Sequence, residues 1–200
     1  MANGLIFYWL SWMLWIVITF FLNKSFIRTM AACFTLAMIF LAETYINLMS
    51  LKISLSYILL LGLLIVFQAK KKQLLLHTFT AFSVAVGYMG TLIWVNFTPL
   101  NLFFPSDAVI FVVLLLLISN IISKPKSRLV AGSLGITVGE IGYSLISIYY
   151  GYKDIVGDMG FFDLLTPVVG VIFIHTYIIE ARRKANKSNI ITRQKLRKNA

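Results

Sequence analysis

Long apolar runs, separated by short polar segments, follow one another along almost the entire chain. A helix needs about 20 mostly apolar residues to cross the hydrocarbon core of a bilayer. The runs therefore predict seven transmembrane helices: Gly4–Leu22, Met30–Ser50, Ile53–Ala69, Leu74–Val95, Ala108–Ser123, Leu129–Tyr150 and Leu164–Ile179. The pattern predicts an all-α fold, a polytopic transmembrane bundle formed by residues 1–180, followed by a basic tail over residues 181–200.

The segments between the runs are too short to form a separate soluble domain. The longest is Gly151–Asp163, whereas only Leu51 and Lys52 separate the second run from the third. No internal repeat is visible, so the inverted-repeat architecture of many transporters gains no support.

The composition agrees with a membrane protein. Of the 200 residues, 60% are hydrophobic and 12% are charged, and the mean hydropathy is +0.88, whereas soluble domains have about 25% charged residues. A soluble domain and a disordered chain are therefore excluded. One Cys permits no intrachain disulfide, and with two His it cannot form an ordinary structural zinc site. We expect no metal and no cofactor.

The formal net charge of +11 is unevenly placed along the chain. Most basic residues lie in the tail and in alternate connections, namely Lys24, Arg28, Lys70, Lys71, Lys72, Lys124, Lys126 and Arg128. Cytoplasmic loops collect Lys and Arg, so seven helices place the N-terminus outside and the C-terminus inside. The first run has no basic segment before it and no small-residue cleavage site, which predicts an uncleaved first helix rather than a signal peptide.

The tail carries eight basic residues: Arg182, Arg183, Lys184, Lys187, Arg193, Lys195, Arg197 and Lys198. Such a segment attracts anionic lipid headgroups, by about 1 kcal/mol for each cation near the surface. It contains no aromatic residue on which a base could stack. We therefore expect the partners to be the lipid bilayer and its anionic headgroups, and no nucleic acid.

Glu140 is the most informative polar position. It follows Arg128 by twelve residues, which places it about 18 Å into the bilayer. Polar residues recur around it at spacings of three and four: Ser133, Thr137, Glu140, Ser144 and Ser147. A charge at this depth costs about 2.5 kcal/mol or more. Glu140 is either a carboxylate that binds a proton or cation, or a neutral carboxyl hydrogen-bonded to a neighbouring helix.

Glycines lie beside this polar stripe at the same spacing: Gly132, Gly135, Gly139 and Gly142. Small residues allow two helices to approach closely, and Gly135 with Gly139 forms a G-x-x-x-G pair. The sixth helix is therefore predicted to be the packing centre of the bundle.

Glu43 and the two histidines with Asn120 are further polar candidates. Glu43 lies toward the outer end of the second run and could share a cavity with Glu140 or extend to the outer surface. His175 lies in the inner half of the last run, where His77 and Asn120 could join it in a polar cluster or bond separately to other helices.

Asp163 and Asp107 precede the last and fifth runs, where they would act as helix N-caps. Cys33 is expected to be a small apolar filler buried in the second helix.

Sequence marks of common enzymes and receptors are missing. The chain has no G-x-S-x-G, no H-E-x-x-H, no glycine-rich phosphate loop, and no Lys in the seventh run for a retinal Schiff base. We do not expect an enzyme.

Three stretches resemble a known family. They are the first helix with its flank (Phe7-Tyr8-Trp9, Trp12 to Ile16, Thr19 to Leu22, Lys24-Ser25 and Arg28-Thr29), then Gly139-Glu140 with Ser144-Leu145, and finally Phe162-Asp163-Leu164. This pattern resembles the YphA-like family, small integral membrane proteins of Bacillus-type bacteria. The resemblance implies a multi-pass protein of a bacterial plasma membrane, and it implies no activity and no functional residues.

Two functional classes follow from the residues. The first, which we favour, is a structural or accessory protein that binds lipid, another membrane protein or a second copy of itself. The second is a small transporter or channel for protons, cations or a small solute that uses Glu140, together with Glu43, Thr137, Ser144 and His175. A polar cavity at Glu140 would favour the second, and a dry, close-packed environment would favour the first.

Overall fold

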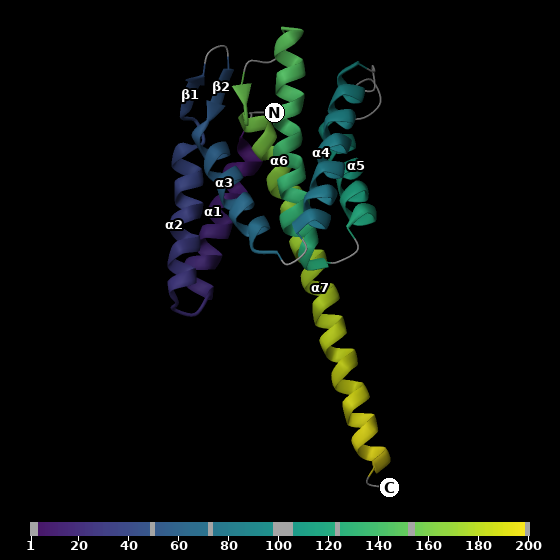
Figure 1. The fold of residues 1–200 in the computed structure, drawn as a ribbon. Helices are drawn as coiled ribbons and strands as arrows, with labels where there is room; N and C mark the ends of the chain where they lie inside the picture. Colours follow the sequence, from purple (N-terminus) through teal and green to yellow (C-terminus); the bar gives the residue numbers. More distant parts are fainter. Residues whose placement is uncertain are drawn as a thin grey trace.

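Helices form almost the whole of the computed structural model, which describes residues 4–48, 51–71, 74–97, 106–122, 125–151 and 155–198 (Figure 1). The described helices are α1 (Leu5–Ile16), continued by the π-helical turn η1 (Val17–Phe21), then α2 (Phe26–Leu41), α3 (Leu55–Ala69), α4 (Leu74–Phe97), α5 (Ser106–Ile121), α6 (Pro125–Tyr149) and α7 (Met159–Lys198). Three short strands accompany them: β1 (Tyr45–Leu48), β2 (Leu51–Ser54) and β3 (Ile155–Val156).

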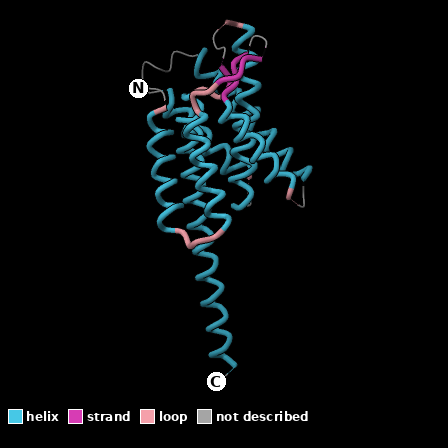
Figure 2. Tube along the Cα trace, turned by 90° about the vertical axis from the view of Figure 1, so that its left-hand side faces the viewer, coloured by secondary structure: helices cyan, strands magenta, loops and turns pink. Residues whose placement is uncertain are grey.

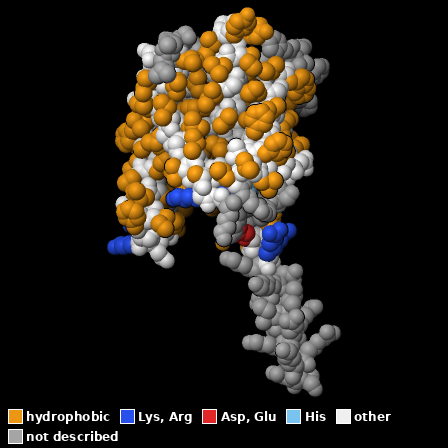
Figure 3. All heavy atoms as spheres, viewed as in Figure 1, with side chains coloured by type: hydrophobic (Ala, Val, Ile, Leu, Met, Phe, Trp, Pro, Cys, Tyr) orange, Lys and Arg blue, Asp and Glu red, His pale blue; other side chains and the backbone are white. Residues whose placement is uncertain are grey.

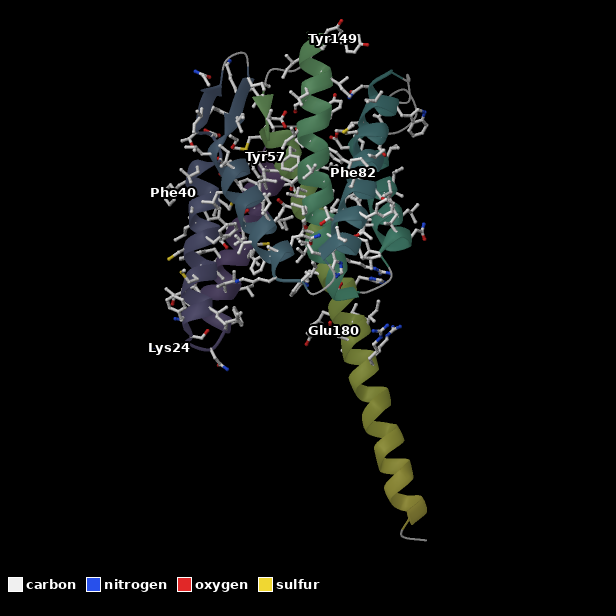
Figure 4. All side chains as sticks on the ribbon, viewed as in Figure 1. Lys24, Phe40, Tyr57, Phe82, Tyr149 and Glu180 are labelled. Carbon is white, nitrogen blue, oxygen red and sulfur yellow. The ribbon has the colours of Figure 1, made fainter. Side chains whose placement is uncertain are left out.

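The helices lie side by side, with the strands gathered at one end of the bundle (Figures 1 and 2). We call this the sheet end, and the opposite end, where Lys24 lies, the basic end (Figure 4). The described chain starts at the sheet end, and α7 extends well beyond the basic end (Figure 1). The most extensive contacts are between α4 and α6.

A helix occurs at each of the seven predicted positions, which confirms the predominantly α fold. The second prediction, Met30–Ser50, is wrong over residues 42–48, because α2 ends at Leu41 and the chain continues into β1; residues 49 and 50 lie outside the described part. The residues after the turn alternate apolar with polar and include Tyr45 and Ile46, types that favour strands. Because these residues are mostly apolar, the sequence pattern predicted that the helix continued through them.

Hydroxyl groups satisfy the carbonyls that α2 leaves unpaired at its end. The Thr44 hydroxyl donates to the Leu41 carbonyl at 2.7 Å. The hydroxyls of Ser54 and Ser56, both fully buried, donate to the carbonyls of Ala42 and Met38. Because unpaired carbonyls at a buried helix end are costly, these bonds fix α3 beside the end of α2.

The sheet has the order β1-β2-β3. Strands β1 and β2 are antiparallel, with Leu48 opposite Leu51, and β3 pairs with β2 in parallel. After β3, Gly157 has a φ of +68° and lies against the Tyr57 ring, where an added Cβ would come within 2.5 Å of the Tyr57 Cβ. Only glycine fits both constraints, and the sheet thereby brings the start of α7 against α3.

The last helix begins five residues before the predicted start. Asp158, not Asp163, caps it, since the Asp158 carboxylate accepts a hydrogen bond from the Phe161 amide at 2.9 Å. The Asp163 carboxylate instead accepts from the amides of Gly4 and Phe7, at 2.6 and 2.8 Å. Asp163 therefore lies inside α7 and caps α1. Asp107 lies within the first turn of α5 rather than before it.

Three of the described helices have the length and hydropathy needed to cross a membrane: Leu74–Asn96, Arg128–Tyr149 and Met159–Arg183. The apolar helices Leu5–Phe21, Phe26–Leu41, Leu55–Ala69 and Asp107–Ile121 are shorter. Hydrophobic side chains cover the face of the bundle seen in Figure 3, with lysine and arginine toward the basic end. Cys33 is exposed on α2, so the expectation that it is buried was wrong.

Candidate functional site

The polar stripe of α6 faces the interior of the bundle. Glu140 is 1% exposed, and the other members of the stripe are also buried: Ser133, Thr137, Ser144 and Ser147. The Thr137 hydroxyl donates to the Ser133 carbonyl of its own helix at 2.7 Å. The stripe therefore places one carboxyl and several hydroxyls among apolar neighbours.

Two buried tyrosines from other helices bind α6 at this level. The Tyr88 hydroxyl, on α4, donates to Glu140 Oε2 at 2.7 Å. The Tyr57 hydroxyl, on α3, donates to the Thr137 carbonyl, and Figure 4 shows the Tyr57 side chain directed from α3 toward α6. Glu140 thus belongs to a polar contact that joins three helices.

The glycine row of α6 allows α4 to approach closely. A Cβ added to Gly135 would lie 2.6 Å from the Ala81 carbonyl oxygen, and one added to Gly139 would lie 2.8 Å from that of Ala85. Gly142 lies against Met89, which is also on α4, while Gly132 faces Ile118 of α5. The close approach also brings Tyr88 within reach of Glu140.

One buried hydroxyl of the stripe has no partner. Ser144 lies one helical turn from Glu140, is 0% exposed, and its hydroxyl has no hydrogen-bond partner within the described residues. Buried polar groups of this kind are usually paired, often with an internal water. An internal water beside Glu140 could therefore form a hydrogen bond with the Ser144 hydroxyl.

Glu43 lies apart from this cluster. It is exposed just beyond the end of α2, where its carboxylate accepts a long hydrogen bond of 3.4 Å from the Tyr8 hydroxyl. Nearby on β1, partial burial raises the pKa of the Tyr45 phenol, and the negative charges of Glu43 and then Asp158 raise it further. Glu43 thus belongs to an acidic group at the sheet end.

His175 also lies apart from Glu140. Its ring is exposed on α7, with Nδ1 at 3.4 Å from the Arg128 guanidinium. Asn120 is exposed on α5 and His77 is half-buried on α4. Within the described side chains, no group of three His, Cys, Asp or Glu is arranged to hold a metal ion.

The basic tail continues α7 without a break in the helix. Arg182 and Arg183 are exposed. The other basic side chains of the tail lie outside the described part: Lys184, Lys187, Arg193, Lys195, Arg197 and Lys198.

Sequence reasoning missed the two tyrosines that contact α6. Tyr88 lies in the middle of an apolar run, whereas membrane tyrosines are enriched at the two interfaces. A phenol at mid-depth in the membrane needs a buried hydrogen-bond partner. The position of Tyr88 in the apolar run could therefore have indicated that it bonds to a polar group of another helix. The same signal is weaker for Tyr57, which lies near the start of α3.

A cavity of about 520 Å³ lies elsewhere, between α1, α2, α3 and α7. Its lining is almost entirely apolar and does not include Glu140. The candidate carboxyl is therefore enclosed by helix packing and does not line this cavity.

A helical bundle with apolar spans, an apolar outer surface and one enclosed carboxyl defines an α-helical integral membrane protein. The chain belongs to the YphA-like integral membrane protein family, whose family model matches residues 3–199. No curated protein and no solved structure matches the chain.

Proposed function

We propose that this protein is an accessory protein of the bacterial plasma membrane that acts by binding lipid or another membrane protein, and not as an enzyme. In this proposal Glu140 is a neutral carboxyl that holds α6 against α4. The supporting observation is the enclosure of Glu140, at 1% exposure, with the Tyr88 hydroxyl as its donor. A charge in such surroundings would carry a large desolvation cost.

The proposal includes seven crossings, with the N-terminus outside and the C-terminus inside. Successive helices run alternately toward the sheet end and the basic end (Figure 1), as crossings joined by short connections would. The basic end carries the exposed cations Lys24, Arg182 and Arg183 and the half-buried Arg28, which favours the cytoplasmic side for that end. The four shorter helices would require local thinning of the bilayer.

The basic extension of α7 supports a surface role on the cytoplasmic side. In this proposal the cations nearest the bundle, Arg182 and Arg183, bind anionic headgroups where α7 leaves the membrane. Self-association through the apolar outer surface remains compatible with the same role.

A second candidate is a small transporter or channel for protons or cations. The unpartnered Ser144 hydroxyl favours it, because a water bound there would lie one turn from Glu140. The separation of Glu43 and His175 from Glu140 weighs against a path that uses all three.

Difference infrared spectroscopy of the bilayer-reconstituted protein during a pH titration distinguishes the two functions. Subtraction of the spectrum of Glu140→Gln isolates the Glu140 carboxyl band. We expect a protonated band that persists across neutral pH and shifts to higher frequency in Tyr88→Phe, since the phenol hydrogen bond is lost. Tyr149→Phe is the control, because Tyr149 is 86% exposed. A band that titrates near neutrality or responds to added cations would establish the transporter instead.

A further inference from the structure

The 520 Å³ cavity is a groove that runs along the helices. On α1 and the first residue of η1 its lining extends from Phe7 to Val17, a rise of about 15 Å along the helix. On α7 it extends over a similar length, from Phe162 to Phe173. The hydrocarbon core of a bilayer is about 30 Å thick, so the groove has the length of one leaflet's acyl chains. A transmembrane helix of a partner would need the full thickness.

The chemistry of the lining suits a hydrocarbon. No charged side chain lines the groove, and the polar ones are Ser11, Thr35 and Thr166. The hydroxyls of Thr35 and Thr166 donate to carbonyls of their own helices, those of Ala31 and Phe162. Their bonding capacity is thereby largely used within the helix, and a polar ligand would lose its hydration without gaining adequate partners.

The groove is narrowed at the sheet end by contacts between α1 and α7. The rings of Phe7 and Phe162, both buried, lie with their centroids 5.0 Å apart. Next to them, the Asp163 carboxylate binds the amides of Gly4 and Phe7. An elongated ligand would therefore enter from the other direction, from the basic end or from the side.

Cations lie beyond the groove in that direction. Lys24 is exposed and Arg28 is half-buried where the chain turns from η1 into α2. Among the described residues, the hydrogen bonds of the Arg28 guanidinium are two long ones of 3.5 Å to the carbonyls of Thr19 and Leu22, so it keeps donors for an anion. The apolar groove and these cations together match a ligand with a hydrocarbon chain and a negative head.

We propose that the groove binds one acyl chain of an anionic phospholipid from the leaflet at the basic end, with the headgroup beside Lys24 and Arg28. This inference rests on the membrane embedding and the lipid-binding role proposed above, and it names the lipid class and the binding site.

Photo-crosslinking in proteoliposomes tests the site with the full-length protein. The probe is phosphatidylglycerol with a diazirine near the end of one acyl chain, and the comparison is phosphatidylcholine with the same chain, each at trace level in otherwise identical vesicles. Mass spectrometry of the digested protein locates the adducts. We expect adducts from phosphatidylglycerol on groove residues of α1, α2 and α7, above those from phosphatidylcholine.

Two glycines provide a matched pair of variants. Gly170 lines the groove, and an added Cβ there meets nothing within 4 Å, so Gly170→Phe fills the groove without a backbone clash. Gly62 on α3 is exposed, also has nothing within 4 Å of an added Cβ, and lies outside the groove lining. Gly170→Phe should lower groove labelling about tenfold, as expected when several buried methylene contacts are lost, and Gly62→Phe should leave it unchanged.

Further variants keep the result interpretable. Met13→Trp enlarges a different, partly exposed lining residue and should lower labelling if Gly170→Phe fails to fold. The double variant Lys24→Gln with Arg28→Gln should abolish the preference for phosphatidylglycerol while groove labelling by both lipids continues.

Three outcomes would overturn the inference: groove labelling unaffected by Gly170→Phe and Met13→Trp, equal labelling by both lipids in the unmodified protein, or crosslinks through the groove to a second copy of the chain. None of these depends on the protonation of Glu140. A titrating Glu140 together with groove labelling would reject only the accessory function, whereas a protonated Glu140 without labelling would reject only the lipid site.

Discussion

The absence of a Cβ at two glycines determines how closely α4 and α6, the helices with the most extensive contacts, approach each other. Gly135 and Gly139 place α6 against the backbone of α4, where an added Cβ would come within 2.6 and 2.8 Å of carbonyl oxygens. Carbonyls of a helix cannot move aside as a flexible side chain can. The hydrogen bond between Tyr88 and Glu140 requires α4 and α6 to lie this close. It therefore depends on glycine, which has no Cβ, at positions 135 and 139.

Gly135→Ala should lower the free energy of unfolding by about 1–3 kcal/mol, the usual cost of overpacking a close contact. Thermal or denaturant unfolding in detergent micelles provides the measurement. Gly90→Ala is the matched control on α4, since an added Cβ there meets nothing within 4 Å. It should be neutral or stabilising by about 0.5–1 kcal/mol, because alanine favours helix. Equal effects of the two substitutions would contradict the proposed role of the glycine row.

At the scale of elements, the unpaired groups at helix ends are satisfied by residues of other helices and strands. Asp163 of α7 binds two amides at the start of α1, and Ser54 and Ser56 bind carbonyls near the end of α2. Each bond satisfies a group that the helix itself leaves unpaired. These caps also position neighbouring helices, so the order in which the helices pack is fixed at their ends as well as along their lengths.

Asp163→Ala should release the start of α1 and leave α7 intact. The loss of an N-cap costs about 1 kcal/mol, so the amides of Gly4 and Phe7 should exchange hydrogen about fivefold faster. Hydrogen exchange with mass spectrometry in micelles measures this rate. Asp158→Ala is the control, because its carboxylate caps α7 through the Phe161 amide. It should accelerate exchange at the start of α7, and the reverse pattern would show that the caps are assigned to the wrong helices.

At the scale of the whole molecule, the two ends of the bundle differ in charge. The sheet end carries Glu43, Asp158 and Asp163 together with the exposed Lys52. Exposed lysine and arginine lie toward the basic end, with Glu180 near them (Figures 3 and 4). An apolar surface connects the two ends. This polarity supports one orientation across a membrane, with the basic end facing the cytoplasm.

Single cysteines at the two ends test that orientation. In a Cys33→Ala background, Lys24→Cys and Tyr149→Cys place thiols at opposite ends of the bundle (Figure 4). An impermeant maleimide added to intact spheroplasts should label the thiol at position 149, and should label the one at position 24 only after lysis. Labelling of both from the same side would overturn the seven-crossing topology.

The positions of the helices could largely be predicted from the sequence, since apolar length and flanking charge are local properties. The prediction failed where a strand and a helix share the same apolar content, at Tyr45–Leu48 and at Ile53 and Ser54. The sequence also predicted that Asp163 caps the last helix. Its role as the cap of α1 could not be predicted, because no residue near Asp163 in the sequence indicates which distant helix it contacts. The three-and-four spacing of polar residues and glycines around Glu140 was visible, but not the identity of the facing helix.

The sequence by itself determined the class of protein, the sites of the helices and the burial of a carboxyl on α6, because hydropathy and helical periodicity act within one segment. Only the tertiary structure decided the partners. It brought Tyr88 and Tyr57 to α6, kept Glu43 and His175 away from Glu140, and formed a groove from four helices. Contacts between distant segments depend on how helices cross and how closely their backbones approach, and neither quantity is contained in the pattern of any single helix.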